Sequence, residues 1–327
     1  MQLFLQNAFL VLRQLAGIYL IVGMGIAAER LKWFPAATAK LCTQLLLYVV
    51  TPCVIINSFL QMEYSADELR NLGIAAFGGA LIFSTGIAIA WRLYRGKRHP
   101  DTDPILHYAS IYGNCGFMGL PLARAIVGDI GVFYVSIVVI VFQMLAFTHG
   151  MWVMAGGAVR NEELGTKNRE QVRFSLKTLL FNPGVVAVSI GLPLYLFSAP
   201  VPALLVEPIR SVAVMNTPLA MMIFGTYLSR TKLNTVFQNK KVFLAASIKM
   251  LAVPAVLMTV LLLLGVRGPL LHALLIPAST PCANNTAVFA AKFDRDAGYG
   301  AQVVALFSMI SVFTMPMILA LAMSFGG

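Results

Sequence analysis

A polar, glycine-rich interruption in an apolar stretch is the first part of the chain that could bind a solute. It reads YGNCGFMGLPLARAIVG over residues 112–128. Glycine lowers helix propensity by about 1 kcal/mol, and proline removes a backbone hydrogen bond and clashes with the preceding turn. Gly113, Gly116, Gly119 and Pro121 therefore predict a broken helix here, with the carboxamide of Asn114 beside the break.

A second interruption of the same kind lies in the other half of the chain. It reads PASTPCANNTAVFAAKF over residues 277–293, where Pro277 and Pro281 should break the helix. Its polar side chains belong to Thr280, Asn284, Asn285 and Thr286. Unwound backbone at membrane depth must be satisfied by protein or by a water-filled cavity, and paired interruptions in corresponding helices are typical of a transporter's substrate site.

Two interpretations of the asparagines in these segments stay open. Broken half-helices turn free N–H groups and positive dipole ends toward one point, which suits an anion, and carboxamides can then donate or accept hydrogen bonds. Alternatively, the asparagines only cap the breaks that glycine and proline create.

The elements that position these residues are predicted to be membrane helices. Hydrophobic residues make up 59% of the chain, charged residues only 11%, and the mean hydropathy is +0.81. A helix needs about 20 mostly apolar residues to cross the hydrocarbon core. Ten such stretches occur, near 6–28, 39–60, 72–91, 105–127, 131–156, 181–199, 206–228, 242–265, 269–291 and 300–323. The sequence therefore predicts an all-α integral membrane protein with ten transmembrane helices.

The basic residues predict the orientation of these helices. Eighteen of the 24 Lys and Arg residues fall in the connections after helices 1, 3, 5, 7 and 9. Because cytoplasmic loops carry the excess of Lys and Arg, both termini should lie outside a multi-pass protein of the cell inner (plasma) membrane. The net charge of +11 is thus a topology signal and not a nucleic-acid-binding surface.

An internal repeat is indicated by paired landmarks at a nearly constant offset. Cys115 and Cys282 lie 167 positions apart, and so do Asp129 and Asp296. Two units of five helices each must be inverted relative to one another, because five is odd. We predict a first five-helix repeat over 1–160, a cytoplasmic connecting loop over 161–180 and an inverted second repeat over 181–327, with broken crossover helices 4 and 9.

A few polar residues inside the predicted helices are further candidates. A cation well inside a span costs about 2.5–3.5 kcal/mol on insertion scales, so Lys249 is either a counter-charge for an anionic solute or snorkels toward the cytoplasmic interface. The remaining candidates either form helix kinks or line the cavity; they are Thr51, Asn216 and Thr217.

The sequence gives little support for catalysis, for metal or cofactor binding, or for proton antiport by a buried carboxylate. The four histidines show no metal-ligand spacing, and no nucleophile and base can be paired, so we expect no enzyme activity, no metal site and no cofactor. All 13 Asp and Glu residues fall in connections or near predicted helix ends, which disfavours a buried-carboxylate proton antiporter. Whether H⁺, Na⁺ or no ion is coupled stays open.

The motifs resemble those of the auxin efflux carrier family, which includes bacterial malonate-type permeases and PIN-type plant auxin exporters. The resemblance spans essentially the whole chain. It is carried by GNCGFMGLP at 113–121, by the stretch from Lys249 to Pro254, and by PCANN at 281–285 leading to AKF at 291–293. It implies two inverted five-helix repeats, broken helices that cross at the membrane centre, and elevator-like alternating access.

The resemblance also implies which residues contact the solute. Asn114 matches the substrate-facing asparagine of the first crossover, followed by Gly116, Gly119 and Pro121. In the second crossover the adjacent Asn284 and Asn285 leave a one-residue ambiguity, and Asn285 is favoured. The short segment at about 157–180 replaces the long hydrophilic loop of plant exporters, which weakens the inference that auxin is the solute.

These observations favour a secondary carrier of small organic anions, such as mono- or dicarboxylates or auxin-like acids. A channel or a non-transporting membrane receptor for a small solute is the alternative. The expected partners are the organic anion and the lipid bilayer, without nucleic acid. The sequence leaves the oligomeric state open, with a homodimer as one option.

Overall fold

The computed structural model describes residues 2–94, 99, 101–156, 182–230 and 236–325. These residues are almost entirely helical, and the part of the chain that the structure describes contains no β-strand beyond one isolated bridge. The predicted connecting loop at 161–180 lies outside the described residues.

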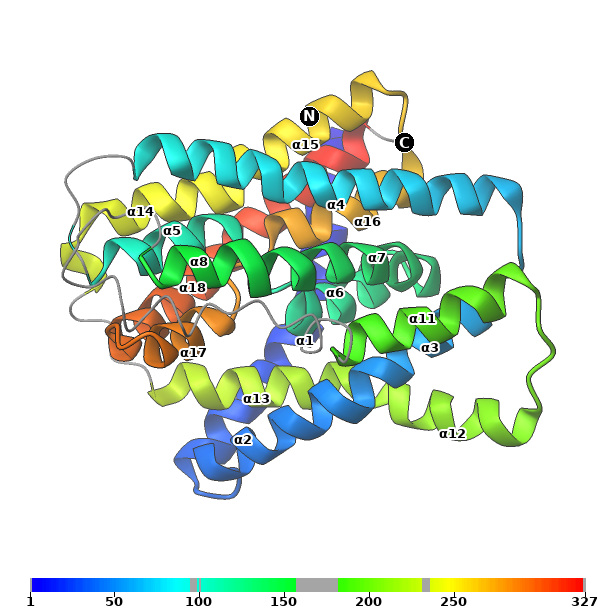
Figure 1. The fold of residues 1–327 in the computed structure, drawn as a ribbon, viewed down its shortest axis with the longest axis horizontal. Helices are drawn as coiled ribbons and strands as arrows, with labels where there is room; N and C mark the ends of the chain where they lie inside the picture. Colours follow the sequence, from blue (N-terminus) through cyan, green and yellow to red (C-terminus); the bar gives the residue numbers. More distant parts are fainter. Residues whose placement is uncertain (1, 95–98, 100, 157–181, 231–235, 326–327) are drawn as a thin grey trace.

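The first half of the chain folds into long helical segments, several of which are made of shorter pieces (Figure 1). The pieces are α1 (Gln2–Arg30), α2 (Ala36–Leu45), η1 (Leu46–Val50), α3 (Thr51–Leu60), α4 (Ala66–Leu93), α5 (Asp103–Ile111), η2 (Cys115–Gly119), α6 (Leu120–Ile126), α7 (Asp129–Leu145), η3 (Ala146–Gly150) and α8 (Met151–Met154). The pieces from α2 to α3, from η2 to α6 and from α7 to α8 follow one another without a gap.

The second half repeats this pattern of long and divided segments. Its elements are α11 (Pro183–Leu196), α12 (Ala203–Val214), α13 (Asn216–Arg230), η5 (Val236–Gln238), α14 (Lys240–Ser247), η6 (Ile248–Ala252), α15 (Val253–Leu263), α16 (Gly268–Ser279), α17 (Asn285–Lys292) and α18 (Ala297–Phe325).

Among the described residues, six helical segments are long and apolar enough to cross a membrane. They are Ala37–Leu60, Ala66–Leu93, Asp129–Met154, Ala203–Arg230, Lys240–Leu263 and Ala297–Phe325. Shorter apolar helices cover Cys115–Ile126, Pro183–Leu196 and Gly268–Ser279. The all-α membrane architecture is therefore confirmed, although α11 is shorter than the span predicted at 181–199.

Three π-helical turns precede a proline in the same register. η1, η2 and η6 each end two residues before a proline, at Pro52, Pro121 and Pro254. A proline lacks an N–H and its ring clashes with the carbonyl four residues earlier, and the wider π turn accommodates both effects. The prediction that Pro121 breaks its helix is therefore wrong, because the helix continues from η2 into α6. Pro277 likewise stays inside α16.

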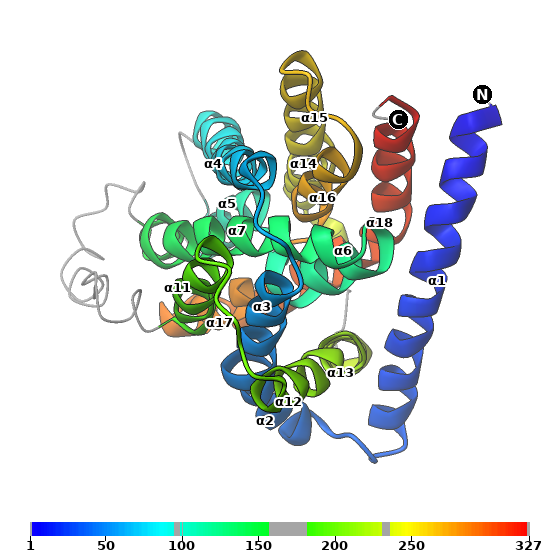
Figure 2. The ribbon, with the colours of Figure 1, turned by 90° about the vertical axis from the view of Figure 1, so that its right-hand side faces the viewer.

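The helices pack into two groups. In the flanking group, defined as α1, α2, α3, α11, α12 and α13, α1 packs on α13, and α3 packs on α11 and α12. In the crossover group, defined as α4–α8 and α14–α18 with their π turns, α7 packs on α4, α6 and α16, and α18 packs on α16 and α17. Figure 2 shows α1 at the edge of the molecule beside α18, with the N- and C-terminal ends at the same side.

The contact between α1 and α13 in the flanking group depends on two glycines. A Cβ atom on Gly25 of α1 would lie 2.3 Å from the carbonyl oxygen of Met222, and one on Gly225 of α13 would lie 2.1 Å from that of Val22. Small residues let membrane helices approach closely, since their association depends on van der Waals packing. The α1–α13 contact therefore requires glycine at both positions.

Candidate functional site

The two predicted interruptions meet at the centre of the crossover group. Gly113 and Cys282 form an antiparallel β-bridge. The N–H of Asn114 donates to the carbonyl oxygen of Pro281 at 2.8 Å, and the N–H of Ala283 donates to that of Tyr112 at 2.9 Å. The helix breaks lie at 112–114 and 280–284, so each unwound backbone satisfies part of the other.

The carboxamides beside the breaks are not used as helix caps. Asn114 precedes η2 and Asn284 precedes α17, and neither side chain makes a capping hydrogen bond. By contrast, the side chain of Asn182 caps α11 by accepting from the N–H of Gly184 at 3.0 Å. The capping interpretation therefore fails for Asn114 and Asn284, whose carboxamides are left for another partner.

The candidate residues beside the two helix breaks differ in how much of their surface is exposed. Asn114 is buried, with 4% of its surface exposed, whereas Gly116, Asn284 and Asn285 are half-buried. A Cβ atom on Gly116 would meet nothing within 4 Å, so open space lies beside the first turn of η2. Gly119 is buried with only ordinary contacts around it.

Thr280 and Thr286 are fully buried, and their hydroxyls are committed to the backbone. Thr280 donates to the carbonyl oxygen of Pro277 at 2.8 Å, and Thr286 donates to that of Ala283 at 2.6 Å. These hydrogen bonds stabilise the backbone conformation at the two ends of the break.

Lys249 points into the crossover and does not snorkel to an interface. It is 0% exposed, and its Nζ donates to the carbonyl oxygen of Ala278 at 2.6 Å. It also lies 3.4 Å from the carbonyl oxygen of Pro277. These carbonyls belong to the last turn of α16, where the helix end carries partial negative charge. Lys249 thus contacts protein backbone at the break.

The remaining candidates lie on the flanking group. Thr51 begins α3 and is half-buried, as is Thr217. Asn216, the first residue of α13, is 4% exposed, and its Oδ1 has no hydrogen-bond partner within the described residues. The helix that Asn216 begins, α13, packs against η2 and α6 of the crossover group.

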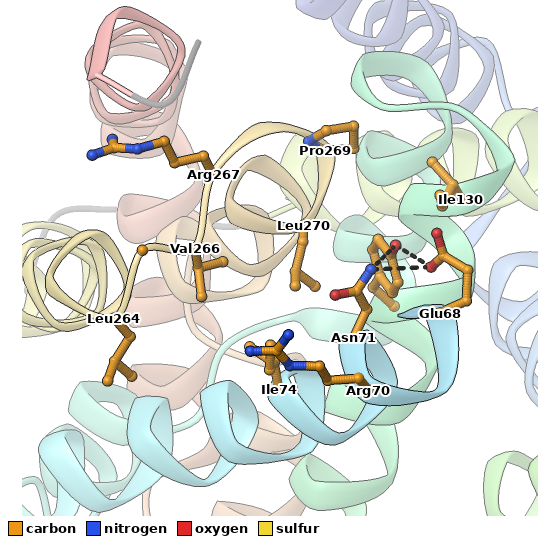
Figure 3. Close-up of a pocket in the computed structure, with 12 residues that line it drawn as sticks. Glu68, Arg70, Asn71, Ile74, Ile130, Leu264, Val266, Arg267, Pro269 and Leu270 are labelled. Atoms are coloured by element: carbon orange, nitrogen blue, oxygen red, sulfur yellow. Dashed lines mark hydrogen bonds between the residues drawn. The ribbon is translucent and has the colours of Figure 1, made fainter. Parts of the chain in front are cut away.

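A cavity that the sequence analysis did not predict lies at the other end of α16 (Figure 3). It has a volume of about 340 Å³ and is bounded by the starts of α4 and α7 and by the α15–α16 connection. Tyr134 donates to Glu68, and the amide of Asn71 lies 3.2 Å from the Tyr134 hydroxyl. Since α16 has 12 residues, the cavity lies about 18 Å from the break, at 1.5 Å per residue.

Replacing Tyr134 with phenylalanine should lower the free energy of unfolding by about 1 kcal/mol, since the hydroxyl joins α7 to α4 and its loss leaves Glu68 with only the longer hydrogen bond from Asn71, at 3.4 Å. The thermal unfolding midpoint of the detergent-solubilised protein measures this. Tyr64→Phe is a matched control, because Tyr64 is 47% exposed and its ring packs at a tilt against Tyr195, a contact that does not involve the hydroxyl. Equal midpoints for both variants would contradict the expected role of the hydroxyl.

Comparison with known proteins supports the membrane architecture described above. No curated protein matches the chain. A family model described as "Membrane transport protein" matches residues 10–319 and so includes both interrupted segments and nearly all the helices. Members of this family are transporters. The chain therefore belongs to the membrane transport protein family, the family of the auxin efflux carriers.

Proposed function

We propose that the protein is a secondary carrier of small organic anions, such as mono- or dicarboxylates, and that Asn114 and Asn285 contact the solute at the crossover. The observation that carries this proposal is the meeting of two broken helices whose asparagine carboxamides cap nothing. Asn284 is the alternative to Asn285 in the second break.

An anionic solute fits the local electrostatics best. The first turn of a helix leaves N–H groups without intrahelical partners and carries partial positive charge. The first turn of η2 borders open space at Gly116, so a carboxylate could reach it. The ammonium of Lys249 adds positive charge behind Gly113.

The bridge supports the proposed ten-helix architecture with two inverted repeats, 1–160 and 181–327. Its two hydrogen bonds flank Gly113 and Cys282, and one of them joins Asn114 to Pro281. These residues are 167 positions apart, the same offset that separates Cys115 from Cys282. A two-fold axis relating the repeats would pass through this point.

Elevator-type alternating access is supported by the division into two groups. The crossover group holds both breaks, while the flanking group contacts it through α1 on α18, through α3 and α11 on α7, and through α13 on α6 and η2. Sliding of the crossover group along these helices would carry a bound solute across the membrane without separating the bridged breaks.

The positions of the basic connections also support the proposed orientation in the plasma membrane. In Figure 1 the α1–α2 connection and the start of α14 lie toward the left, and the α3–α4 and α11–α12 connections lie at the right. The α1–α2 connection contains Lys32, and α14 begins with Lys240 and Lys241. This end would face the cytoplasm.

The proposal is tested by uptake of labelled mono- and dicarboxylates into proteoliposomes. Loss of a hydrogen bond to a charged solute costs about 1.5–3 kcal/mol, so Asn114→Ala and Asn285→Ala should each reduce uptake about tenfold to a hundredfold. Asn284→Ala resolves the one-residue ambiguity. Asn182→Ala is the matched control, because this asparagine is a helix cap and its loss should lower stability but not uptake.

Undiminished uptake in both crossover variants would show that the asparagines do not bind the solute. A carrier is separated from a channel by counterflow: an excess of unlabelled solute inside the vesicles should stimulate uptake of labelled solute. If no carboxylate is taken up, the assignment of an organic anion is wrong.

A further inference from the structure

The end of half-helix α16 presents backbone oxygens that no following turn can satisfy. The helix stops at Ser279, and the carbonyl oxygens of Pro277 and Ala278 face the ammonium of Lys249 at 3.4 and 2.6 Å. The hydroxyl of Thr280 donates to the same Pro277 oxygen. A cation is therefore held by helix-end carbonyls at the centre of the crossover.

No carboxylate balances this cation within the described residues. Lys249 is fully buried and makes no ion pair there, and its nearest polar partners are backbone oxygens. A buried charge is costly unless dipoles or counter-charges offset it. The partial negative charge at the end of α16 is the offsetting group.

The backbone at Gly113 leaves space for the side chain of Lys249. A Cβ atom on Gly113 would lie 2.7 Å from Cε and 2.8 Å from Nζ of Lys249, and 2.6 Å from the hydroxyl oxygen of Thr280. Glycine at position 113 thus leaves the space that the ammonium fills, directly behind the bridge to Cys282.

Within the described residues, the first half of the chain has no cation at the equivalent position. The residue 167 positions before Lys249 is Ile82, which is fully buried in α4. Among the residues that the structure describes, the ammonium of Lys249 at the C-terminal end of α16 therefore has no counterpart at the matching position of the first half.

Carbonyl oxygens of this kind, at half-helix C-terminal ends and in unwound backbone, coordinate coupling Na⁺ in secondary transporters. We propose that Lys249 is a resident cation that occupies the position of a coupling metal ion, so that the carrier needs no Na⁺. Removing the lysine side chain then creates a Na⁺ site formed by the oxygens of Pro277, Ala278 and Thr280. This inference rests on the proposed carrier function.

The experiment compares Lys249→Ala, which leaves both carbonyls and space, with Lys249→Met, which fills the space without a charge. Lys240→Ala is the control, because Lys240 is exposed at the start of α14. Thermal unfolding midpoints are measured in detergent with NaCl, choline chloride or propylammonium chloride at equal ionic strength. Uptake of the labelled carboxylates is measured in proteoliposomes with the same salts.

We expect the parent and Lys240→Ala to be indifferent to Na⁺ in both assays. Lys249→Ala should lose uptake about tenfold or more in choline. Na⁺ or propylammonium should restore part of its uptake and raise its unfolding midpoint by about 2 °C, as expected for a ligand near ten times its Kd. Lys249→Met should respond to neither cation.

The proposal is overturned if Na⁺ raises the unfolding midpoint or the uptake of the parent, or if Lys249→Ala responds to neither Na⁺ nor propylammonium. If Lys249→Ala cannot be purified in choline, its recovery when purified in propylammonium supports the proposal, and no recovery opposes it. Failure of the carrier function is distinguishable, because the parent would then take up no carboxylate while the unfolding midpoints still report on the cation site.

Discussion

Gly113→Ala should abolish carboxylate uptake, the largest functional effect that we expect from a single methyl group. The new Cβ would lie within 2.8 Å of the Lys249 ammonium and the Thr280 hydroxyl, so the lysine must leave the carbonyls of α16 or the bridge to Cys282 must open. Overpacking of this kind costs about 1–3 kcal/mol of stability. Proteoliposome uptake and the thermal unfolding midpoint together measure the effect.

Gly73→Ala on α4 is the control for this substitution, because its Cβ would meet nothing within 4 Å. It should retain uptake and gain a little stability from the higher helix propensity of alanine. Parent-like uptake by Gly113→Ala would mean that the close fit of Lys249 against the crossover backbone is not needed for transport.

Gly225→Ala should have the largest effect on stability, and Gly25→Ala should have a similar one. In both cases the added methyl group meets a backbone carbonyl of the facing helix, at 2.1 and 2.3 Å, and a backbone cannot move aside as a flexible side chain can. The α1–α13 contact must widen, at a cost of about 3 kcal/mol or more. We expect a low yield of folded protein and a sharply lowered unfolding midpoint.

The matched controls lie on the same helix. Gly17 and Gly23 of α1 have nothing within 4 Å of an added Cβ, so Gly17→Ala and Gly23→Ala should leave the unfolding midpoint unchanged or slightly raised. If Gly225→Ala and Gly23→Ala unfold at the same temperature, the glycine contact between α1 and α13 does not stabilise the fold.

The class of the fold could be predicted from the sequence because apolar stretches of helix-spanning length are a local property. The helix breaks could also be predicted, although the first break is shorter than expected. Gly113, Gly116, Gly119 and Pro121 were expected to form it, but of these only Gly113 lies in the break, because a π turn lets the helix begin at Cys115 and pass through Pro121. Hydrogen-bond register within a helix depends on the facing helices, which a local pattern does not contain.

The contacts across the crossover were beyond prediction for a different reason. Lys249 was identified as an unusual charge, but its partners are backbone carbonyl oxygens in the last turn of α16. Every residue has such an oxygen, so the sequence does not indicate which ones contact the lysine. Gly25 likewise resembles Gly23 as one more glycine in an apolar helix. Only the position of Met222 on α13 separates the two.

The bridge between Gly113 and Cys282 has a consequence for how the family can diversify. Its hydrogen bonds join main-chain atoms only, between Asn114 and Pro281 and between Ala283 and Tyr112. Side chains at the neighbouring positions can therefore be exchanged during evolution while the two chain segments still cross at the same point. Under the proposed function, substitution at Asn114, Asn284 or Asn285 would change the solute preference while the main-chain crossing that brings these residues together is kept.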